Sequence, residues 1–234
     1  MNVSPPNMDR LRASEPVFRA RWMLRGKRHS PLQDFHYATN SIFVHIPKCG
    51  GMSVLRNLYG TQKQHGHTPA AAYRSADPAF YKSAFVFTFV RDPIARFVSA
   101  YTFLKQGGVN DQDREFGQRA LPWDNMDEAV IELGNHKKWD TLLRWKHFRP
   151  QYHFVSGHRA GGKYGVDFIG RQDQMQDGLD YICDRLGHPR LVAKSVNVTK
   201  RPADVALSAE TQAIVAEKYA ADMELWDLAK SGAF

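Results

Sequence analysis

Residues 41–53 read Ser-Ile-Phe-Val-His-Ile-Pro-Lys-Cys-Gly-Gly-Met-Ser and constrain the fold more than any other part of the chain. The stretch opens with an almost unbroken apolar run, which is typical of a strand buried on both faces of a parallel sheet. Lys48 follows, and Gly50 and Gly51 then let the backbone turn tightly and approach a ligand. Apolar residues at helical spacing, closed by Gly60, predict a helix after the glycines. Strand, glycine loop and helix in this order predict a cradle for a phosphate or sulfate group.

A second apolar run covers residues 84–90 and ends at Arg91. Asp92 fits the N-cap of a following helix, and Pro93 fits its first position. A guanidinium group offers a planar fork to phosphate oxygens, and Ser99, two turns into that helix, adds a hydroxyl. The sequence therefore predicts that a second strand also ends at an anion-binding residue.

The remaining pattern indicates strands that alternate with helices. A third strand is expected over 166–170, and helices are expected over 52–59, 93–101, 127–133, 137–148, 175–186 and from about 208 through 226. Residues 69–83 are interpreted as a polar connection, and residues 107–125 as a loop that borders an acceptor cleft. This order favours an α/β fold, a P-loop-like parallel sheet flanked by helices, with the ligand at the carboxyl ends of its strands.

The charge is concentrated near the N-terminus. The chain has a net charge of +8, and residues 1–30 hold seven basic side chains against two acidic ones. We therefore divide the chain into a basic N-terminal extension, residues 1–40, with at most one short helix, and one domain, residues 41–234. This distribution argues against a nucleic-acid partner. Packing of the extension on the domain is favoured over contact with an anionic surface.

The sequence also predicts the cellular compartment of the protein. No apolar run approaches the roughly 18 residues that cross a membrane, and the N-terminus lacks the apolar segment of a signal peptide. A cytoplasmic location is therefore expected. The two cysteines, Cys49 and Cys183, are too few for a disulfide framework and are expected to be free thiols.

The loop of residues 47–53 differs from the P-loop of nucleotide triphosphatases, because Lys48 precedes the glycines instead of following them. Pro-Lys-x-Gly-Gly-x-Ser after a buried strand resembles the 5′-phosphosulfate loop of sulfotransferases that use 3′-phosphoadenosine 5′-phosphosulfate. The carbohydrate branch, with Ile-Pro-Lys-Thr-Gly-Gly-Thr-Ser, is the most similar. Cys49 and Met52 stand where that branch has threonines. Residues 91–101 are similar to the 3′-phosphate motif of the same enzymes, Arg-(Asn/Asp)-Pro-x-x-Arg-x-x-Ser-x-Tyr.

The resemblance implies a sulfotransferase with this phosphosulfate as co-substrate, no metal, and a hydroxyl acceptor, favoured to be a carbohydrate. The residues that it assigns to the donor are Lys48, Cys49, Gly50, Gly51, Met52, Ser53, Arg91 and Ser99. Residues 195–201 resemble the Asn-x-Ser loop of the family, which adds Lys200 and Arg201, although a solvated basic loop is an equally good interpretation. Phe148-Arg149-Pro150-Gln151 resembles a Phe-x-Pro-Gln segment of carbohydrate sulfotransferases.

Two residues are predicted to act in catalysis. Lys48 is placed to neutralise charge on the leaving group. His67 is the predicted general base, because His65-Gly66-His67 resembles a His-x-His element of the uronyl 2-O-sulfotransferase branch, whose second histidine is the base. His45 is expected to face away from the loop. The alternative is that both loop histidines only bind backbone. If His67 is not the base, His65, Asp111 and Asp113 are the next candidates.

Two other functions stay open at this point. A nucleotide-dependent kinase with an unusual loop is disfavoured, because the chain lacks Gly-Lys-Ser/Thr and an acidic strand end for magnesium. A non-catalytic protein that binds phosphonucleotides or anionic glycans would keep both anion motifs. Only the predicted base distinguishes that protein from an enzyme.

Overall fold

The computed structural model describes residues 8–61, 66–134, 136–159, 162–193 and 207–231. The chain forms two compact units. The first comprises Met1–Arg91, Gln151–Val196 and Glu224–Phe234, and the second comprises Asp92–Pro150 and Asn197–Met223. Each unit is described by itself.

The first unit is built on a parallel sheet of three strands in the order β1-β2-β3. Its strands are β1 (Ser41–Phe43), β2 (Phe85–Val90) and β3 (Phe168–Arg171). Phe43 pairs with Phe87, which in turn pairs with Phe168. All three strands lie where the sequence predicts them, and the mixed α/β fold is confirmed.

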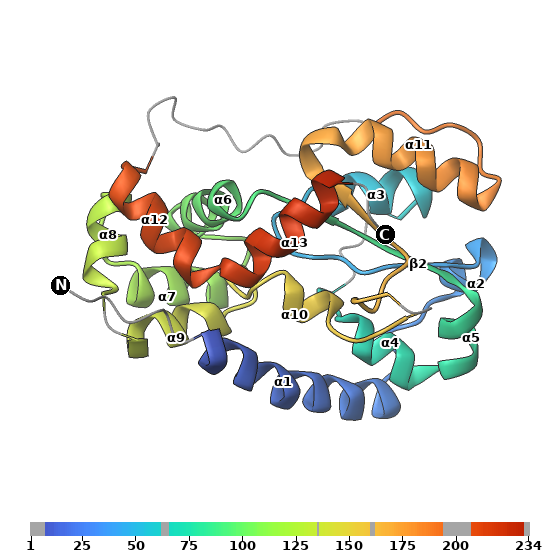
Figure 1. Ribbon diagram of the computed structural model, residues 1–234, viewed down its shortest axis with the longest axis horizontal. Coiled ribbons are helices and arrows are strands. Elements are labelled where there is room, and N and C mark those ends of the chain that lie inside the picture. Colours follow the sequence, from blue (N-terminus) through green and yellow to red (C-terminus); the bar gives the residue numbers. More distant parts are fainter. Residues whose placement is uncertain (1–7, 62–65, 135, 160–161, 194–206, 232–234) are drawn as a thin grey trace. The chain divides into compact units, whose positions relative to one another are not determined.

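Helices cover both faces of this sheet (Figure 1). The phenylalanines of β2 face α3 (Gly51–Leu58) and α11 (Met175–Leu186), which follows the short 3-10 helix η1 (Gln172–Gln174). The valines of β2 face α4 (Ala70–Ala76), α10 (Tyr152–Val155) and the end of α13 (Ala220–Ser231). The central strand is therefore buried on both sides, as its apolar run predicts.

The N-terminal segment is more helical than the sequence indicated. A helix of 21 residues, α1 (Met8–Arg28), is followed by α2 (Asp34–Thr39), so the expectation of at most one short helix was wrong. Helix α1 lies along α4 and α10 (Figure 1). Its Phe18 ring is 5.3 Å from the His153 ring, and Gly26 lies directly against the carbonyl of Ala72. Packing of this helix on the unit is thereby confirmed. The domain boundary at residue 40 stays a prediction.

Two segments expected to be irregular are helical. Residues 69–83 form α4 and α5 (Pro78–Ser83), and Asp77 caps α5 by accepting a hydrogen bond of 2.9 Å from the Phe80 amide. Residues 107–125 contain α7 (Asp111–Ala120), which buries Phe116 and is capped by Asn110. Helices of 6 to 10 residues are too short to show a clear apolar periodicity.

The described part of the second unit is helical. It contains α6 (Pro93–Lys105), α7, α8 (Met126–Glu132), α9 (His136–Arg144), α12 (Ala209–Lys218) and the start of α13. Asp92 caps α6 as predicted, accepting a hydrogen bond of 2.8 Å from the Ala95 amide. The expected single helix after Ser208 is two helices, because α12 ends before Tyr219, whose hydroxyl donates to the Phe148 carbonyl. Arg96 is buried and donates to the Arg149 carbonyl, so it is an internal residue of this unit.

We predict that Gly178→Ala destabilises the protein, although alanine favours helices by up to about 1 kcal/mol over glycine. A Cβ atom at Gly178 would lie 2.5 Å from the ring of Phe89, which is fully buried. Overpacking of this kind costs about 1–3 kcal/mol. Urea unfolding measures the change. The penalty should shrink in a Phe89→Leu background, and an equal penalty in both backgrounds would contradict the contact.

Candidate active site

The loop between β1 and α3 has the conformation that an anion cradle needs. Gly50 has φ +76°, and α3 begins at Gly51 without a hydrogen bond from a capping side chain. The amides of a helix's first turn point out of the helix, and anions are stabilised there. Lys48 has φ +69°, in the left-handed region, which costs of order 1–3 kcal/mol for a residue with a side chain. The backbone is therefore held in a strained conformation at the predicted donor loop.

Two histidines lie beside the start of this helix. The His45 ring packs directly on Gly51, leaving no room for a side chain there, and His45 is only 5% exposed. The expectation that His45 faces away from the loop was therefore wrong. The His67 ring is 4.5 Å from the His45 ring, measured between centroids. His67 Nδ1 donates to the His45 carbonyl over 3.2 Å, because a carbonyl oxygen can only accept.

Arg91 reaches the same loop from the end of β2. Its Nη1 donates to the Lys48 carbonyl over 3.3 Å. Lys48 and Arg91, one from each predicted anion motif, therefore lie together at the carboxyl edge of the sheet. This is the edge at which open α/β sheets bind ligands.

Gln151 forms hydrogen bonds to both of these segments. Its side chain is fully buried, and its Nε2 donates to the Arg91 carbonyl over 2.8 Å. Its Oε1 accepts from the Arg91 amide over 3.0 Å and from Cys49 Sγ over 3.2 Å. One amide therefore fixes both the end of β2 and the donor loop. The sequence carried a weak signal for this residue, the Phe-x-Pro-Gln segment, but no role.

The start of α11 also borders the loop. A Cβ atom at Gly50 would lie 2.9 Å from Cε of Met175 and 3.4 Å from Cγ of Gln172. Sequence reasoning gave neither residue a role at the loop. Their proximity depends on how β3 and α11 pack on the sheet, which no local pattern encodes.

The other loop residues have different surroundings. Cys49 is 1% exposed, and its thiol contacts Gln151, so its side chain acts within the fold. Met52 packs against the apolar cluster under α3. The Ser53 amide donates to the Gly50 carbonyl over 3.0 Å, which closes the first turn of the helix.

Other predicted residues belong to the second unit or fall outside the described residues. Ser99 lies on α6 in the second unit, and its role at the donor stays a prediction. Lys200, Arg201 and His65 fall outside the described residues. Asp113, an alternative base, is fully buried and pairs with Lys146 at 3.0 Å, and Asp111 pairs with Arg114 at 2.6 Å. A buried, paired carboxylate is poorly suited to take a proton from an acceptor.

Comparison with known protein families assigns the chain to a family. The model described as "Sulfotransferase family" matches residues 38–229. The chain belongs to the sulfotransferase family. The match covers the donor loop, His67, Arg91 and Gln151. The family transfers sulfuryl groups to hydroxyl-bearing acceptors, which agrees with the motifs found in the sequence.

Further comparisons add no relative to this assignment. Neither the search of curated proteins nor the search of solved structures returned a significant match. Among the described helices, none is long and apolar enough to cross a membrane.

We predict that Gln151→Glu lowers the free energy of unfolding by about 1–3 kcal/mol, the usual cost of an unsatisfied buried polar group. The carboxylate keeps the size of the side chain but cannot donate to the Arg91 carbonyl. Chemical denaturation measures the loss. The matched control is Gln118→Glu, the same change at an exposed position of α7, which should have little effect. Equal stabilities of the two variants would show that the amide is dispensable.

Proposed function

We propose that this sulfotransferase moves a sulfuryl group from 3′-phosphoadenosine 5′-phosphosulfate to a carbohydrate hydroxyl. The observation that carries the proposal is the hydrogen bond between Arg91 Nη1 and the Lys48 carbonyl, 3.3 Å long. It joins the loop that resembles a 5′-phosphosulfate site to Arg91, the first residue of the segment that resembles a 3′-phosphate site. A donor with anionic groups on both sides of one nucleoside fits this pair.

The proposed donor contacts divide between the two motifs. Residues 48–53 would hold the 5′-phosphosulfate through the amides at the start of α3. Arg91 and Ser99 would hold the 3′-phosphate, and Lys200 and Arg201 remain proposed contacts on the resemblance alone. Backbone amides suit the first task because they are fixed before the anion arrives.

Lys48 is the proposed electrophilic residue. Its partly buried side chain starts at the loop where the bond between sulfur and the bridging oxygen would break. An ammonium group there stabilises the negative charge that builds on the departing phosphate. Because this charge is larger in the transition state than in the bound donor, the effect raises turnover more than donor affinity.

His67 is the proposed general base. Its Nδ1 donates to the His45 carbonyl, so the neutral ring carries its lone pair on Nε2, the atom that accepts a proton. The same hydrogen bond ties His67 to the segment that leads into Lys48. The carbohydrate acceptor is proposed because this histidine resembles the base of the uronyl 2-O-sulfotransferase branch.

The donor is tested by thermal denaturation. Adenosine 3′,5′-bisphosphate should raise the melting temperature where magnesium ATP does little, since a ligand at 100 times its dissociation constant stabilises by about 2.7 kcal/mol. Arg91→Ala should reduce this shift, whereas Arg56→Ala, an exposed arginine on α3, should leave it unchanged. Equal shifts from both nucleotides would refute the donor and favour the kinase alternative.

The base is tested by turnover at saturating donor. His67→Asn should lower turnover by about 10²-fold or more and remove the acid limb of the pH profile, because the general base is lost. Bisphosphate binding should survive. His29→Asn, at an exposed histidine, serves as the control and should keep full activity. Retained activity in His67→Asn would place the base elsewhere, and absence of turnover in the unmutated protein with intact bisphosphate binding would favour a non-catalytic binder.

A further inference from the structure

The first unit has a polar pocket at the amino edge of its sheet, where the strands begin. Asn40, Ala84 and Asp167, each of which directly precedes a strand, line it together with the C-terminal ends of α5 and α11. Its volume is about 620 Å³, which is typical of pockets that bind small molecules. We call it the amino-edge pocket.

The amino-edge pocket and the donor loop lie at opposite edges of the sheet. The donor loop follows the end of β1, whereas the pocket is lined by the residues that precede the strands. Strand β2 is six residues long, and a strand rises about 3.3 Å per residue, so the two places are roughly 20 Å apart. The pocket is therefore a separate site.

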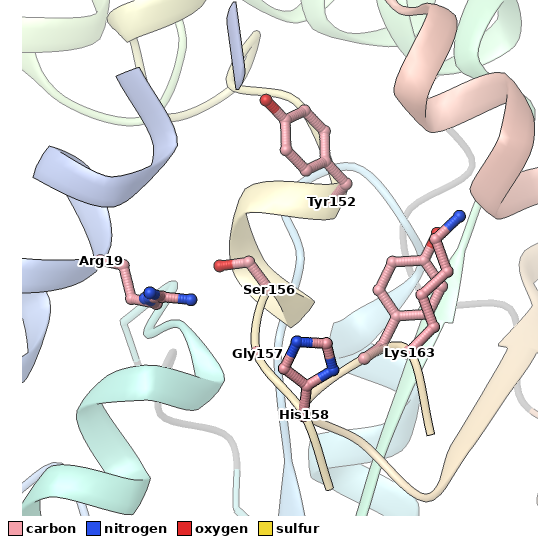
Figure 2. A pocket seen from close by; sticks show the side chains of 7 residues that line it. Arg19, Tyr152, Ser156, Gly157, His158 and Lys163 are labelled. Atoms are coloured by element: carbon pink, nitrogen blue, oxygen red, sulfur yellow. The ribbon is translucent and has the colours of Figure 1, made fainter. Parts of the chain in front are cut away.

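A smaller pocket of about 200 Å³ lies beside the end of α10 (Figure 2). Arg19, Ser156 and His158 line it. Ser156 Oγ already donates to the His153 carbonyl over 3.2 Å, and His158 Nδ1 donates to the Gly162 carbonyl over 3.3 Å. Because these polar groups are engaged within the protein, the amino-edge pocket is the better candidate for a ligand.

The lining of the amino-edge pocket is more positive than negative. Its cations are Lys82, Arg159 and Arg185, and its acid is Asp167. Arg159 Nε lies 2.7 Å from Asp167 Oδ1, so these two charges offset each other. Lys82 and Arg185 are exposed, and neither has an ion pair within the described part of the chain. Two positive charges are thus left for a ligand.

Helix capping and helix salt bridges do not account for these two cations. Basic residues are common in the last turn of a helix, where they face free carbonyls. At the end of α5, however, the Arg159 guanidinium already donates to the carbonyls of residues 81, 82 and 84. The end of α11 is capped by Gly187, whose amide donates to two carbonyls of the last turn. No acid lies three or four residues from Lys82 or Arg185 in the sequence.

The pocket wall is fixed by hydrogen bonds within the protein. Asp167 Oδ1 accepts from Arg159 Nε over 2.7 Å, and its Oδ2 accepts from the Val86 amide over 2.8 Å. The Asn40 carbonyl accepts from the Phe85 amide over 3.0 Å, which holds the starts of β1 and β2 together. A preorganised wall lowers the conformational cost of binding.

Tyr181 gives the pocket an aromatic surface. Its ring stacks on the Phe168 ring, with centroids 4.5 Å apart and an angle of 26° between the planes. Tyr181 is nevertheless 48% exposed, so part of the ring is open to a ligand. Phe85 adds little open surface, because it is 9% exposed and the Arg185 guanidinium lies over its ring. A single open aromatic surface beside polar groups suits the C–H face of a sugar ring.

Asp167 favours a ligand with hydroxyl groups over a purely anionic one. A carboxylate has about four lone-pair sites. Asp167 uses one on each oxygen, and its side chain is 25% exposed, so it can accept further hydrogen bonds. Sugar hydroxyls donate such bonds, whereas a sulfate ion has no donor and is repelled by the carboxylate.

We propose that the amino-edge pocket is a second binding site for an acidic saccharide. The carboxylate or sulfate group of the sugar would pair with Lys82 and Arg185, its ring would lie on Tyr181, and its hydroxyls would donate to Asp167. The site goes beyond the proposed transfer reaction and does not require it. A saccharide long enough to span the sheet would be held here by a unit other than the one that reacts.

The test is isothermal titration of the full chain with the donor site blocked by saturating adenosine 3′,5′-bisphosphate. The probe is a disaccharide that carries one uronate and one sulfate. Lys82→Gln combined with Arg185→Gln should weaken its binding about tenfold or more, because hydrogen bonds to a charged group are lost. The matched control is Lys27→Gln combined with Arg56→Gln. It removes the same charge from two exposed positions outside the lining and should bind as the unmutated protein does.

A further variant tests the aromatic surface. Tyr181→Leu keeps an apolar side chain against Phe168 but removes the open ring, so disaccharide binding should weaken about threefold to tenfold. Sodium sulfate and adenosine 5′-monophosphate are titrated separately at equal ionic strength. Circular dichroism of each variant checks that the helices are retained. Unchanged disaccharide binding in Tyr181→Leu would contradict the placement of the sugar ring.

Each outcome decides the proposal. Disaccharide binding that is weakened in the lining variant and kept in the control supports it. Equal losses in the two double variants would overturn it in favour of diffuse attraction, and full binding in both would place the disaccharide elsewhere. Sulfate or the nucleotide bound as tightly, with the same dependence on Lys82 and Arg185, would overturn the saccharide assignment. No disaccharide binding would also overturn the proposal.

The bisphosphate separates this proposal from the proposed function. It is titrated alone before the disaccharide is added. Failure of the bisphosphate to bind would refute the proposed donor, whereas disaccharide binding that depends on Lys82 and Arg185 would still support the second site.

Discussion

The structure of the first unit depends on one strand that is buried on both faces and paired on both edges. Every residue of β2 is buried, with exposed fractions from 0 to 9%. Its neighbours β1 and β3 run parallel to it, so the chain leaves all three strands at the same edge of the sheet. Phe43 pairs with Phe87, so Lys48 and Arg91 follow this pair at similar distances along their own segments of the chain. The contact between these two residues is a consequence of strand register. A shift by one residue would exchange the phenylalanine face with the valine face, and neither would then fit the helices packed on it.

At that edge, the protein uses buried polar groups to hold a strained loop. Lys48 in the left-handed region and an uncapped helix start are both unfavourable in isolation. The Gln151 amide offsets part of this cost with hydrogen bonds to Arg91 and Cys49, and the His45 ring fills the space under Gly51. The buried thiol of Cys49 therefore has a hydrogen-bond partner.

The interpretation of the sequence failed in places where local pattern carries little information. Residues 107–125 are polar, so α7 was missed, although its Asn110 cap and buried Phe116 stabilise it within its own unit. His45 shares its face of the chain with Phe43, and the 5.5 Å stacking of their rings follows from strand alternation. That alternation is visible in the sequence. Helix α3 covers this face and brings Gly51 against His45. This packing cannot be read from the sequence, because it depends on how the helix packs on the sheet.

The sequence by itself determined the three strands, the glycine loop after β1, the helices that follow β1 and β2, and the family. Strong apolar periodicity and short glycine and proline motifs act over a few residues, so they can be recognised without the tertiary structure. Only the tertiary structure decided that Gln151 joins the two motifs, since 102 residues separate it from Cys49 along the chain. It also decided that His67 donates to the backbone of His45, and that Arg19 of the N-terminal helix meets Ser156 and His158 around one pocket. These are contacts between segments remote in sequence. They arise from the packing of helices on a sheet, and no local pattern specifies which surfaces meet.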